Sequence, residues 1–397
     1  MSALVSIDDA QKILAAAAPA ATVERAALDA ALGRRLAEPV IATVDRPPAD
    51  VSAMDGYAVR LVDVRNAGAS LRIVGESRAG APSAATISSG EAVRIFTGAS
   101  VPPGADHIVM QEDAARDGDC VTIFRGHDKA RHVRPAGMDF RSGEELAPVG
   151  AVIGPSELAA AAAGNLATLG VRRRLRVGIL ANGDELRPPG TTLAPGQIVN
   201  SNPVALAGLI ASWGGEAVDL GVAADSLDSI RTHINRAKSI DILLPVGGAS
   251  VGDHDLMRPA FAAEGFEPLF AKVAIRPGKP TWLSRRGAQI ALGLPGNPAS
   301  AFVCAHIFLR PLLTGDATPF RRARLAAALD AEGSRDSLLR ATARIDNNGA
   351  VLVTPSDNQD SSLIRPFLSA NALVLRRANA PAAAVGDRVD MTLIGPI

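Results

Sequence analysis

The spacing of apolar residues divides the chain into regions with different predicted secondary structure. Residues 7–18 and 24–37 repeat apolar side chains at helical spacing, and Ser6 precedes the first helix as a candidate N-cap. From about residue 60 to 150 the apolar runs are of strand length and are separated by Gly, Pro and Asp, which indicates a small β-rich domain. Helical spacing returns over residues 155–170, with Ser156 as a candidate cap.

Residues 175–315 have the pattern of an α/β domain. The runs at 175–182 and 241–248 are apolar without alternation, and helical segments separate such runs. Strands that are buried on both faces lose the alternation, so we predict a mostly parallel sheet that is covered by helices on both sides. Ligands of such sheets bind beyond the C-terminal ends of the strands. Short strands return after about residue 320.

A chain of 397 residues is too long for one hydrophobic core. The sequence therefore predicts a multidomain α/β plus β fold, with a three-layer α/β domain at its centre. An inserted β-rich domain, an elongated helical and linker domain and a small C-terminal β domain complete it. The predicted boundaries are 1–45 with 145–175 for the elongated domain, 46–144 for the inserted domain, 176–318 for the α/β domain and 319–397 for the C-terminal domain.

Composition excludes several classes of partner. Lys and Arg together number 41, as do Asp and Glu, so no net charge attracts nucleic acid or an anionic membrane. No run reaches about 18 apolar residues and no basic leader precedes the first helix, which leads us to expect a cytoplasmic protein. Cys120 and Cys304 lack the spacing of a metal site.

The loop after the strand at 241–246 contains several glycines. Gly247 and Gly248 allow backbone N–H groups to approach an anion, and Ser250 adds a hydroxyl donor. The loop is either a phosphate cradle or a tight strand-to-helix turn, because its spacing matches neither a dinucleotide nor a P-loop fingerprint.

Asp253 and Asp255 follow these glycines. A carboxylate beside a bound phosphate requires a cation between them, and Mg²⁺ takes one or two carboxylates plus substrate phosphate. The alternative is that one of the two caps the next helix.

Two further segments are candidates for binding an anion. In 293–300, Asn297 has the character of an N-cap and Pro298 that of a first helical residue, so the N–H groups of that turn could face an oxyanion. In 276–280, prolines bracket Arg276 and Lys279 in a restricted, positively charged loop.

Polar loops elsewhere are weaker candidates. Asp55 lies in a turn rich in small residues, and the loops 97–113 and 134–140 have a similar character. By their residues alone these are turns. Asp184 and Glu185 lie beyond the end of a predicted strand, which favours a functional role.

Eight motifs in register carry a resemblance to a known family. They are SAMDGYAVR (52–60), TGASVPPGAD (97–106) with QED (111–113), GMDF (137–140), NGDEL (182–186), GGASVGDHD (247–255), PGKP (277–280), GLPGNPAS (293–300), and NQDSSL with SANAL near the C-terminus. Together they resemble the MoeA family and the gephyrin E-domain over essentially the whole chain.

The resemblance implies an elongated homodimer of four-domain subunits that dimerise through the 1–45 and 145–175 domain. The active site would lie between the α/β domain of one subunit and the inserted domain of its partner. In the implied reaction, adenylylated molybdopterin is cleaved in a step that depends on Mg²⁺ and molybdate, AMP leaves, and molybdenum enters the dithiolene. The upstream adenylyltransferase is a further candidate partner.

The resemblance also implies roles for individual residues. The partner subunit would supply Asp55, Asp139 and Thr97, while the α/β side would hold the phosphates and Mg²⁺. Lys279, Pro280 and Ser300 match positions that bind molybdate in the family. The implied catalytic set is Asp55, Asp139, Glu185, Asp255 and Lys279; the metal set is Glu185, Asp253 and Asp255; the substrate-binding set is Thr97, Gly247, Gly248, Ser250, Arg276, Pro280, Pro295, Asn297, Pro298, Ser300, Ser361 and Ser362.

Two other functions remain open at this point. A catalytically silent relative would bind or scaffold the pterin without releasing AMP. A molybdopterin adenylyltransferase would consume ATP, although the additional β domains argue against it.

Overall fold

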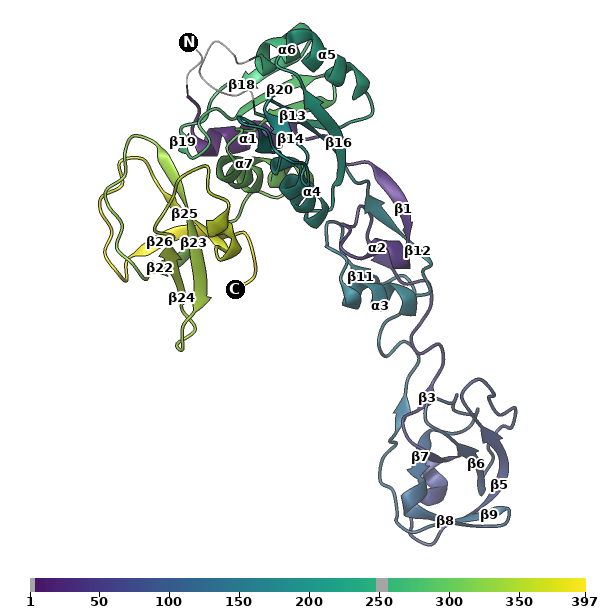
Figure 1. Cartoon of the computed structure of the whole chain (residues 1–397). Coiled ribbons are helices and arrows are strands. Elements are labelled where there is room, and N and C mark those ends of the chain that lie inside the picture. The colour runs from purple at the N-terminus through teal and green to yellow at the C-terminus, as the bar shows by residue number, and fades with distance from the viewer. Residues whose placement is uncertain (1–3, 248–255) are drawn as a thin grey trace. The chain divides into compact units, whose positions relative to one another are not determined.

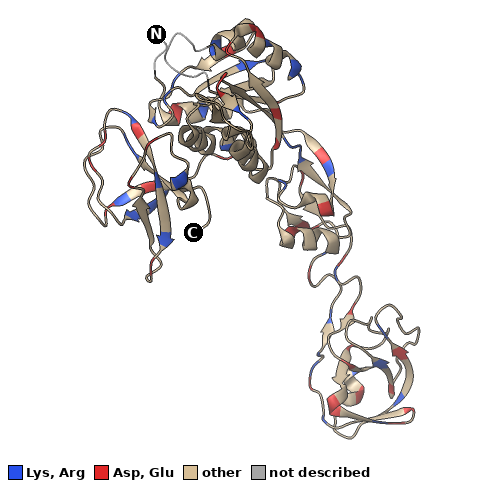
Figure 2. Cartoon of the chain, in the orientation of Figure 1, with Lys and Arg blue, Asp and Glu red and all other residues tan. Residues whose placement is uncertain are grey.

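The chain forms two compact units, which we describe from a computed structural model (Figure 1). The structure describes residues 4–247 and 256–397. Met1–Ala20 and Arg174–Ile397 form one unit, and Ala21–Arg173 form the other. Among the described residues, no helix is long and apolar enough to cross a membrane. Figure 2 shows basic and acidic residues interspersed in both units.

The centre of the first unit is a six-stranded sheet in the order β16-β13-β17-β21-β20-β18. The first four strands are parallel, and β20 and β18 are antiparallel to their neighbours. Every residue of β17 is buried, which accounts for its continuous apolar sequence. The bounds are β13 Arg176–Asn182, β16 Glu216–Ala223, β17 Ile242–Val246, β18 Glu267–Phe270, β20 Trp282–Arg286 and β21 Gln289–Gly293.

Helices cover both faces of this sheet, so the predicted three-layer α/β architecture is confirmed. Ile242 and Leu244 pack on one face with α1, α4 and α7, whereas Leu243 between them packs on the other face with α5 and α6. The bounds are α1 Ile7–Ala17, α4 Asn202–Ser212, α5 Leu227–Arg236, α6 Met257–Ala263 and α7 Pro298–Cys304, which continues through a π-helical turn, η3 Ala305–Leu309, into α8 Arg310–Thr314. The short parallel pair β14 Leu186–Arg187 and β15 Ile198–Val199 extends from this domain.

A small closed barrel follows the α/β domain. Its strands run in the order β23-β24-β22-β26-β25, and β25 pairs back onto β23, so the ring has no free edge between them. The strand β19, which precedes the RPGKP loop, pairs with the start of β23 and joins the α/β domain to the barrel. The bounds are β19 Ile275–Arg276, β22 Arg321–Leu325, β23 Asp336–Ile345, β24 Val351–Pro355, η4 Arg365–Leu368, β25 Ala372–Arg376 and β26 Arg388–Leu393.

The second unit contains a six-stranded sheet in the order β7-β4-β6-β5-β9-β8, in agreement with the predicted β-rich region. Three short antiparallel pairs, β1–β12, β2–β11 and β3–β10, complete its strands. The bounds are β1 Val23–Ala27, α2 Leu28–Ala31, β2 Val40–Ile41, β3 Val51–Ser52, β4 Gly56–Val59, η1 Leu61–Val64, β5 Ser70–Ser77, β6 Glu91–Ile95, β7 His107–Met110, η2 Gln111–Asp113, β8 Ala114–Asp117, β9 Cys120–Ile123, β10 Val133–Arg134, β11 Glu145–Ala147, α3 Pro155–Ala163 and β12 Thr168–Arg172.

Two predicted helices are wrong in part. The segment 24–37 begins as strand β1, because residues 23–27 pair with β12 and this long-range pairing overrides the local helical spacing. The predicted helix 155–170 ends at Ala163, and its N-cap is Gly154, whose N–H is bound by Glu157, rather than Ser156. The last three residues of that segment, 168–170, belong to β12 instead.

The first predicted helix is confirmed together with its cap. The Ser6 hydroxyl accepts a hydrogen bond from the Asp9 N–H at 3.1 Å. Ile7 and Leu14 of this helix belong to the core of the α/β sheet, so α1 groups with the first unit and not with residues 21–45. The finer division of the chain into four domains stays a prediction.

A prediction on pH dependence concerns His107, which is completely buried in the second unit. Its pKa is lowered from 6.5 to about 4, chiefly by burial and next by the charge of the neighbouring His127. The pKa of His107 in the folded state lies below that in the unfolded state, so the unfolded state binds the proton more readily. The contribution of His107 to the free energy of unfolding is therefore fully present above pH 6.5 and is lost as the pH falls towards about 4. Asparagine at this position can still accept the Arg131 N–H that now binds the His107 Nδ1 at 2.9 Å.

We therefore expect His107→Asn to reduce the loss of unfolding free energy between pH 6.5 and 4, as measured by urea denaturation. Equal pH slopes for the variant and the unchanged chain would contradict this assignment.

Candidate functional site

The RPGKP loop brings two cations to the junction between the α/β domain and the barrel. Strand β19 ends at Arg276, and the loop turns back through Gly278, whose φ is +111°. A Cβ at this glycine would lie 2.3 Å from the Cys304 Sγ in α7. Only glycine therefore allows the loop to pack against that helix while it carries Arg276 and Lys279.

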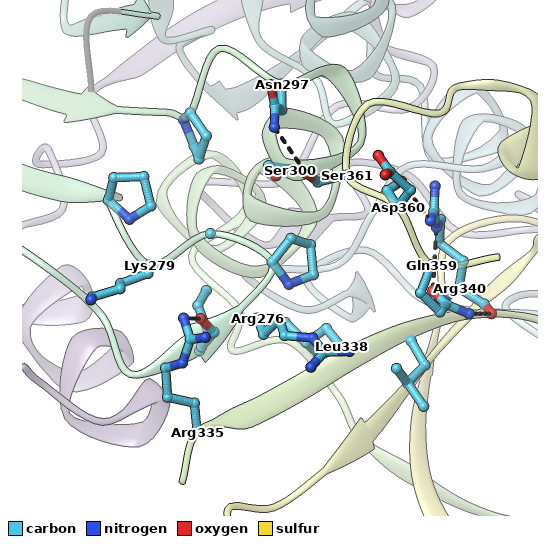
Figure 3. A pocket seen from close by; sticks show the side chains of 16 residues that line it. Arg276, Lys279, Asn297, Ser300, Arg335, Leu338, Arg340, Gln359, Asp360 and Ser361 are labelled. Carbon is cyan, nitrogen blue, oxygen red and sulfur yellow. Dashed lines mark hydrogen bonds between the residues drawn. The ribbon is translucent and has the colours of Figure 1, made fainter. Parts of the chain in front are cut away.

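This loop forms one wall of a cavity of about 460 Å³, which we call the basic cavity. Within the described part of the chain, four cations line it and Asp360 is the one carboxylate. Figure 3 shows Lys279 and Arg335 towards the left of the view, Arg276 near its centre, and Arg340, Gln359 and Asp360 on the right. Its lining residues are Ile275, Arg276, Pro277, Gly278, Lys279, Pro280, Pro295, Asn297, Ser300, Arg335, Leu338, Leu339, Arg340, Gln359, Asp360 and Ser361.

The start of α7 is tied to the barrel. Asn297 occupies the predicted N-cap position, but its side chain makes no capping bond. Its Nδ2 instead donates to the Ser361 Oγ at 2.9 Å (Figure 3). The Ala299 N–H also donates to the Ser361 carbonyl, at 3.0 Å. The Ala299 N–H is one of the groups that we expected to face an oxyanion. It instead donates to the barrel loop that contains Ser361.

Arg340 holds that loop in place from within the barrel. The residue is only 2% exposed, and burial lowers the pKa of its guanidinium. Its Nη1 donates to the Leu363 carbonyl at 2.8 Å, and its Nη2 donates to the carbonyls of Asn358 and Asp360 at 3.1 and 2.9 Å. The buried charge is thus distributed over three backbone acceptors that fix both ends of the loop.

A second cavity of about 610 Å³, which we call the amide cavity, lies beside the first. Among the described residues that line it there is no cation, and Glu185 is the one charged side chain. Pro280, Pro295 and Asn297 line both cavities, so they form a shared wall. The lining residues are Asn182, Glu185, Leu186, Ile198, Val199, Asn200, Ser201, Asn202, Val246, Gly247, Pro280, Pro295, Gly296, Asn297, Pro298 and Ser362.

Pairing between β14 and β15 folds the 186–199 excursion back onto the cavity. The Ile198 N–H donates to the Glu185 carbonyl at 3.0 Å, so the end of the 186–199 segment lies beside its beginning. The three residues that follow β15 then line the cavity, and the Asn202 Nδ2 donates to the Gly296 carbonyl at 2.7 Å. The adjacent serines divide between the cavities: Ser361 lines the basic cavity and Ser362 the amide cavity.

The predicted phosphate loop is described only at its start. Gly247 lines the amide cavity with a φ of +97°, and a Cβ there would lie 2.9 Å from the Asn182 carbonyl oxygen. Gly248, Ser250, Asp253 and Asp255 lie outside the described residues. Glu185 is therefore the one described member of the predicted metal set, and residues 4–247 and 256–397 contain no group of three or more potential metal ligands.

Three other predicted residues lie in the second unit. The Asp55 Oδ1 accepts the N–H of Thr97 at 2.7 Å and its hydroxyl at 2.8 Å. These two hydrogen bonds lower the pKa of the Asp55 carboxyl, so it is ionised at neutral pH. Asp139 is exposed and forms an ion pair with Arg46 at 3.3 Å.

Comparisons with known proteins cover nearly the whole chain. Family models match the MoeA N-terminal region (domains I and II) at residues 5–164, a probable molybdopterin-binding domain at 178–315 and the MoeA C-terminal region (domain IV) at 322–394. The chain belongs to the MoeA family. This confirms the family resemblance and makes the chain a transferase of molybdenum-cofactor biosynthesis.

Individual MoeA relatives agree with this assignment. The chain is 40% identical to the molybdopterin molybdenumtransferase of Nostoc sp. over 292 residues, which are 72% of this chain and 67% of the relative. It is 32% identical to the Staphylococcus aureus protein of the same name over 386 residues, covering 94% and 91% of the two chains. A crystal structure of the molybdopterin biosynthesis MoeA protein of Pyrococcus horikosii matches with a TM-score of 0.87 and 28% identity, over 100% of both chains.

Sequence reasoning missed several lining residues. In the amide cavity these include Asn200, Ser201 and Asn202, whose run of three polar residues before a helix was a usable signal. In the basic cavity they include Arg335 and Arg340, and no sequence pattern marks either of them because each reaches the cavity only through the docking of the barrel.

A prediction on stability follows from the buried contacts of Arg340. Arg340→Met retains an apolar side chain of similar length but leaves the three carbonyl acceptors of the 358–363 loop without their donor. We expect unfolding to become easier by about 2–4 kcal/mol in urea denaturation, and proteolysis within this loop to become faster.

The control is Arg344→Met, because Arg344 is exposed on the same strand. It should change stability by no more than about 0.5 kcal/mol. Equal effects of the two substitutions would show that the Arg340 contacts do not hold the loop.

Proposed function

We propose that this MoeA protein inserts molybdenum from molybdate into molybdopterin, with adenylylated molybdopterin as its Mg²⁺-dependent substrate and AMP as a product. The observation that carries this proposal is the pair of adjoining cavities that share the wall of Pro280, Pro295 and Asn297. By their described residues, one is lined by four cations and the other has Glu185 as its one charged side chain. Two ligands of different charge can then bind side by side, as the transfer of a metal oxide to an organic acceptor requires.

The basic cavity suits molybdate, which is a tetrahedral dianion. The Arg276 guanidinium and the Lys279 ammonium supply charge-assisted donors, and Ser300 adds a hydroxyl at the start of α7. Ser300 is 4% exposed, so the hydroxyl acts away from bulk water, where a hydrogen bond to an anion is stronger.

The amide cavity suits the pterin and the phosphates attached to it. Its volume of about 610 Å³ lies within the usual range for small-molecule sites. Leu186, Ile198 and Val199 offer apolar contact to a flat ring, while Asn200 and Ser201 offer donors and acceptors to its polar edge.

Glu185 fits a role in holding Mg²⁺. Its side chain is exposed at the amide cavity. Mg²⁺ commonly binds one or two protein carboxylates together with substrate phosphate and water. When bound there, the ion would neutralise charge on the diphosphate. Further roles of Asp253 and Asp255 as metal ligands remain predictions from the sequence.

Positioning and charge stabilisation would supply most of the catalysis. The chain contains fixed cations and hydrogen-bond donors on a rigid junction, which can hold the oxyanion and the dithiolene in contact before reaction. The Arg340 contacts would keep the Ser361 side of the cavity in place as ligands enter and leave.

We further propose a homodimer in which Asp55, Thr97 and Asp139 of one subunit complete the site of its partner. Apolar side chains on the second unit support an interface there. Leu32, Val149 and Val152 are each more than half exposed, and the Arg35–Val152 bridge joins the two segments that carry them. Exposed apolar side chains gathered in this way are typical of protein interfaces.

The activity test is AMP release from adenylylated molybdopterin, with and without Mg²⁺ and with molybdate or tungstate. We expect Lys279→Gln to lower the rate about 100-fold, as the loss of one charged donor from an oxyanion site does. Lys238→Gln, which changes an exposed lysine outside both cavities, should keep the full rate. Pterin binding without AMP release would support a silent relative, and consumption of ATP an adenylyltransferase.

Mixed dimers test the shared site. Asp55→Asn and Lys279→Gln chains with different tags would be co-expressed and the heterodimers purified. If each site takes Asp55 from one subunit and Lys279 from the other, one site of each heterodimer carries no substitution. We expect about half of the full activity, whereas both homodimeric variants stay inactive. Inactive heterodimers would place both residues in the site of a single subunit.

A further inference from the structure

Arg335 reaches the basic cavity through the junction between β19 and the barrel. The parallel pairing aligns Ile275 with Asp336 and Arg276 with Ser337, so Arg335, one residue before β23, lies beside the RPGKP loop. Its side chain lines the cavity, as Figure 3 shows. One long hydrogen bond, from its Nη1 to the Ile275 carbonyl at 3.5 Å, is its only bond within the described residues.

This guanidinium has no counter-ion in the described part of the chain. The adjacent carboxylate of Asp336 is occupied by Arg377, at 2.9 Å, and by the Ala378 N–H at 2.8 Å. The other nearby acid, Asp360, accepts the N–H and hydroxyl of Ser362. Arg335 thus places a half-buried positive charge in a cavity wall while most of its five donors remain available.

Arg340 shows the contrasting case. Its guanidinium is also in the cavity wall, but three backbone carbonyls accept its hydrogen bonds, so its task is to hold a loop. An arginine that is partly removed from water and lacks such acceptors gains from an anionic ligand, because the ligand replaces lost hydration.

We infer that Arg335 is a further oxyanion-binding residue, which contacts molybdate from the barrel side while Arg276 and Lys279 contact it from the α/β side. This inference rests on the proposed function in taking molybdate as the anion. It assigns the barrel a direct part in substrate binding in addition to its support of the Ser361 loop.

The test measures binding of molybdate alone to the full-length protein by isothermal titration calorimetry. We expect Arg335→Gln to weaken binding about tenfold and Arg335→Lys to weaken it less, because lysine keeps the charge but loses the planar fork of donors. The dependence of the Kd on salt should also become shallower for Arg335→Gln. Arg344→Gln changes an exposed arginine of β23, the strand that follows Arg335; it serves as the control and should bind like the unchanged chain.

AMP release separates binding from a structural role. Arg335→Gln should raise the KM for molybdate and leave kcat nearly unchanged, since saturating anion replaces the lost affinity. If Arg335→Gln keeps the Kd and KM of the unchanged chain while Lys279→Gln binds molybdate more weakly, the role of Arg335 is overturned and the proposed function is not. Failure of the unchanged chain to bind molybdate would instead overturn the proposed function as well.

Discussion

The docking of the C-terminal barrel on the α/β domain is the constraint on which the site depends. Neither domain contains a complete basic cavity: Lys279 and Ser300 come from one, and Arg340 and Ser361 from the other. The hydrogen bond from Asn297 to Ser361 and the pairing of β19 with β23 fix the two parts in register. Both contacts are directional, so together they fix where the loops that carry the cations lie.

Charge is distributed locally in a way that the balanced totals conceal. Forty-one basic and forty-one acidic residues cancel over the chain, yet the basic cavity has four cations against one carboxylate. In the adjoining amide cavity, Glu185 is the one charged side chain that the described residues supply. Such a division can attract an oxyanion to the basic cavity without giving the chain a general affinity for polyanions, which agrees with the proposed binding of a small dianion.

The sequence predicted the α/β domain well because each of its signals is local. The unbroken apolar run of β17 and the capping residue Ser6 both act within a few positions, and the structure agrees with them. The segment 24–37 failed since its strand character arises from pairing with residues about 145 positions away. Arg335 could not be found for a similar reason: its neighbour Ile275 is 60 positions distant and becomes adjacent only when the barrel docks.

The wall between the two cavities has a chemical consequence of its own. Two of its three residues are prolines, which have no N–H to donate, and the amide nitrogen of the third, Asn297, is already bound to Ser361. Such a wall separates two ligands by its shape and offers few hydrogen-bond donors to either of them. The shared wall therefore competes little with direct contact between the two ligands, and they can meet there without first breaking hydrogen bonds to the protein.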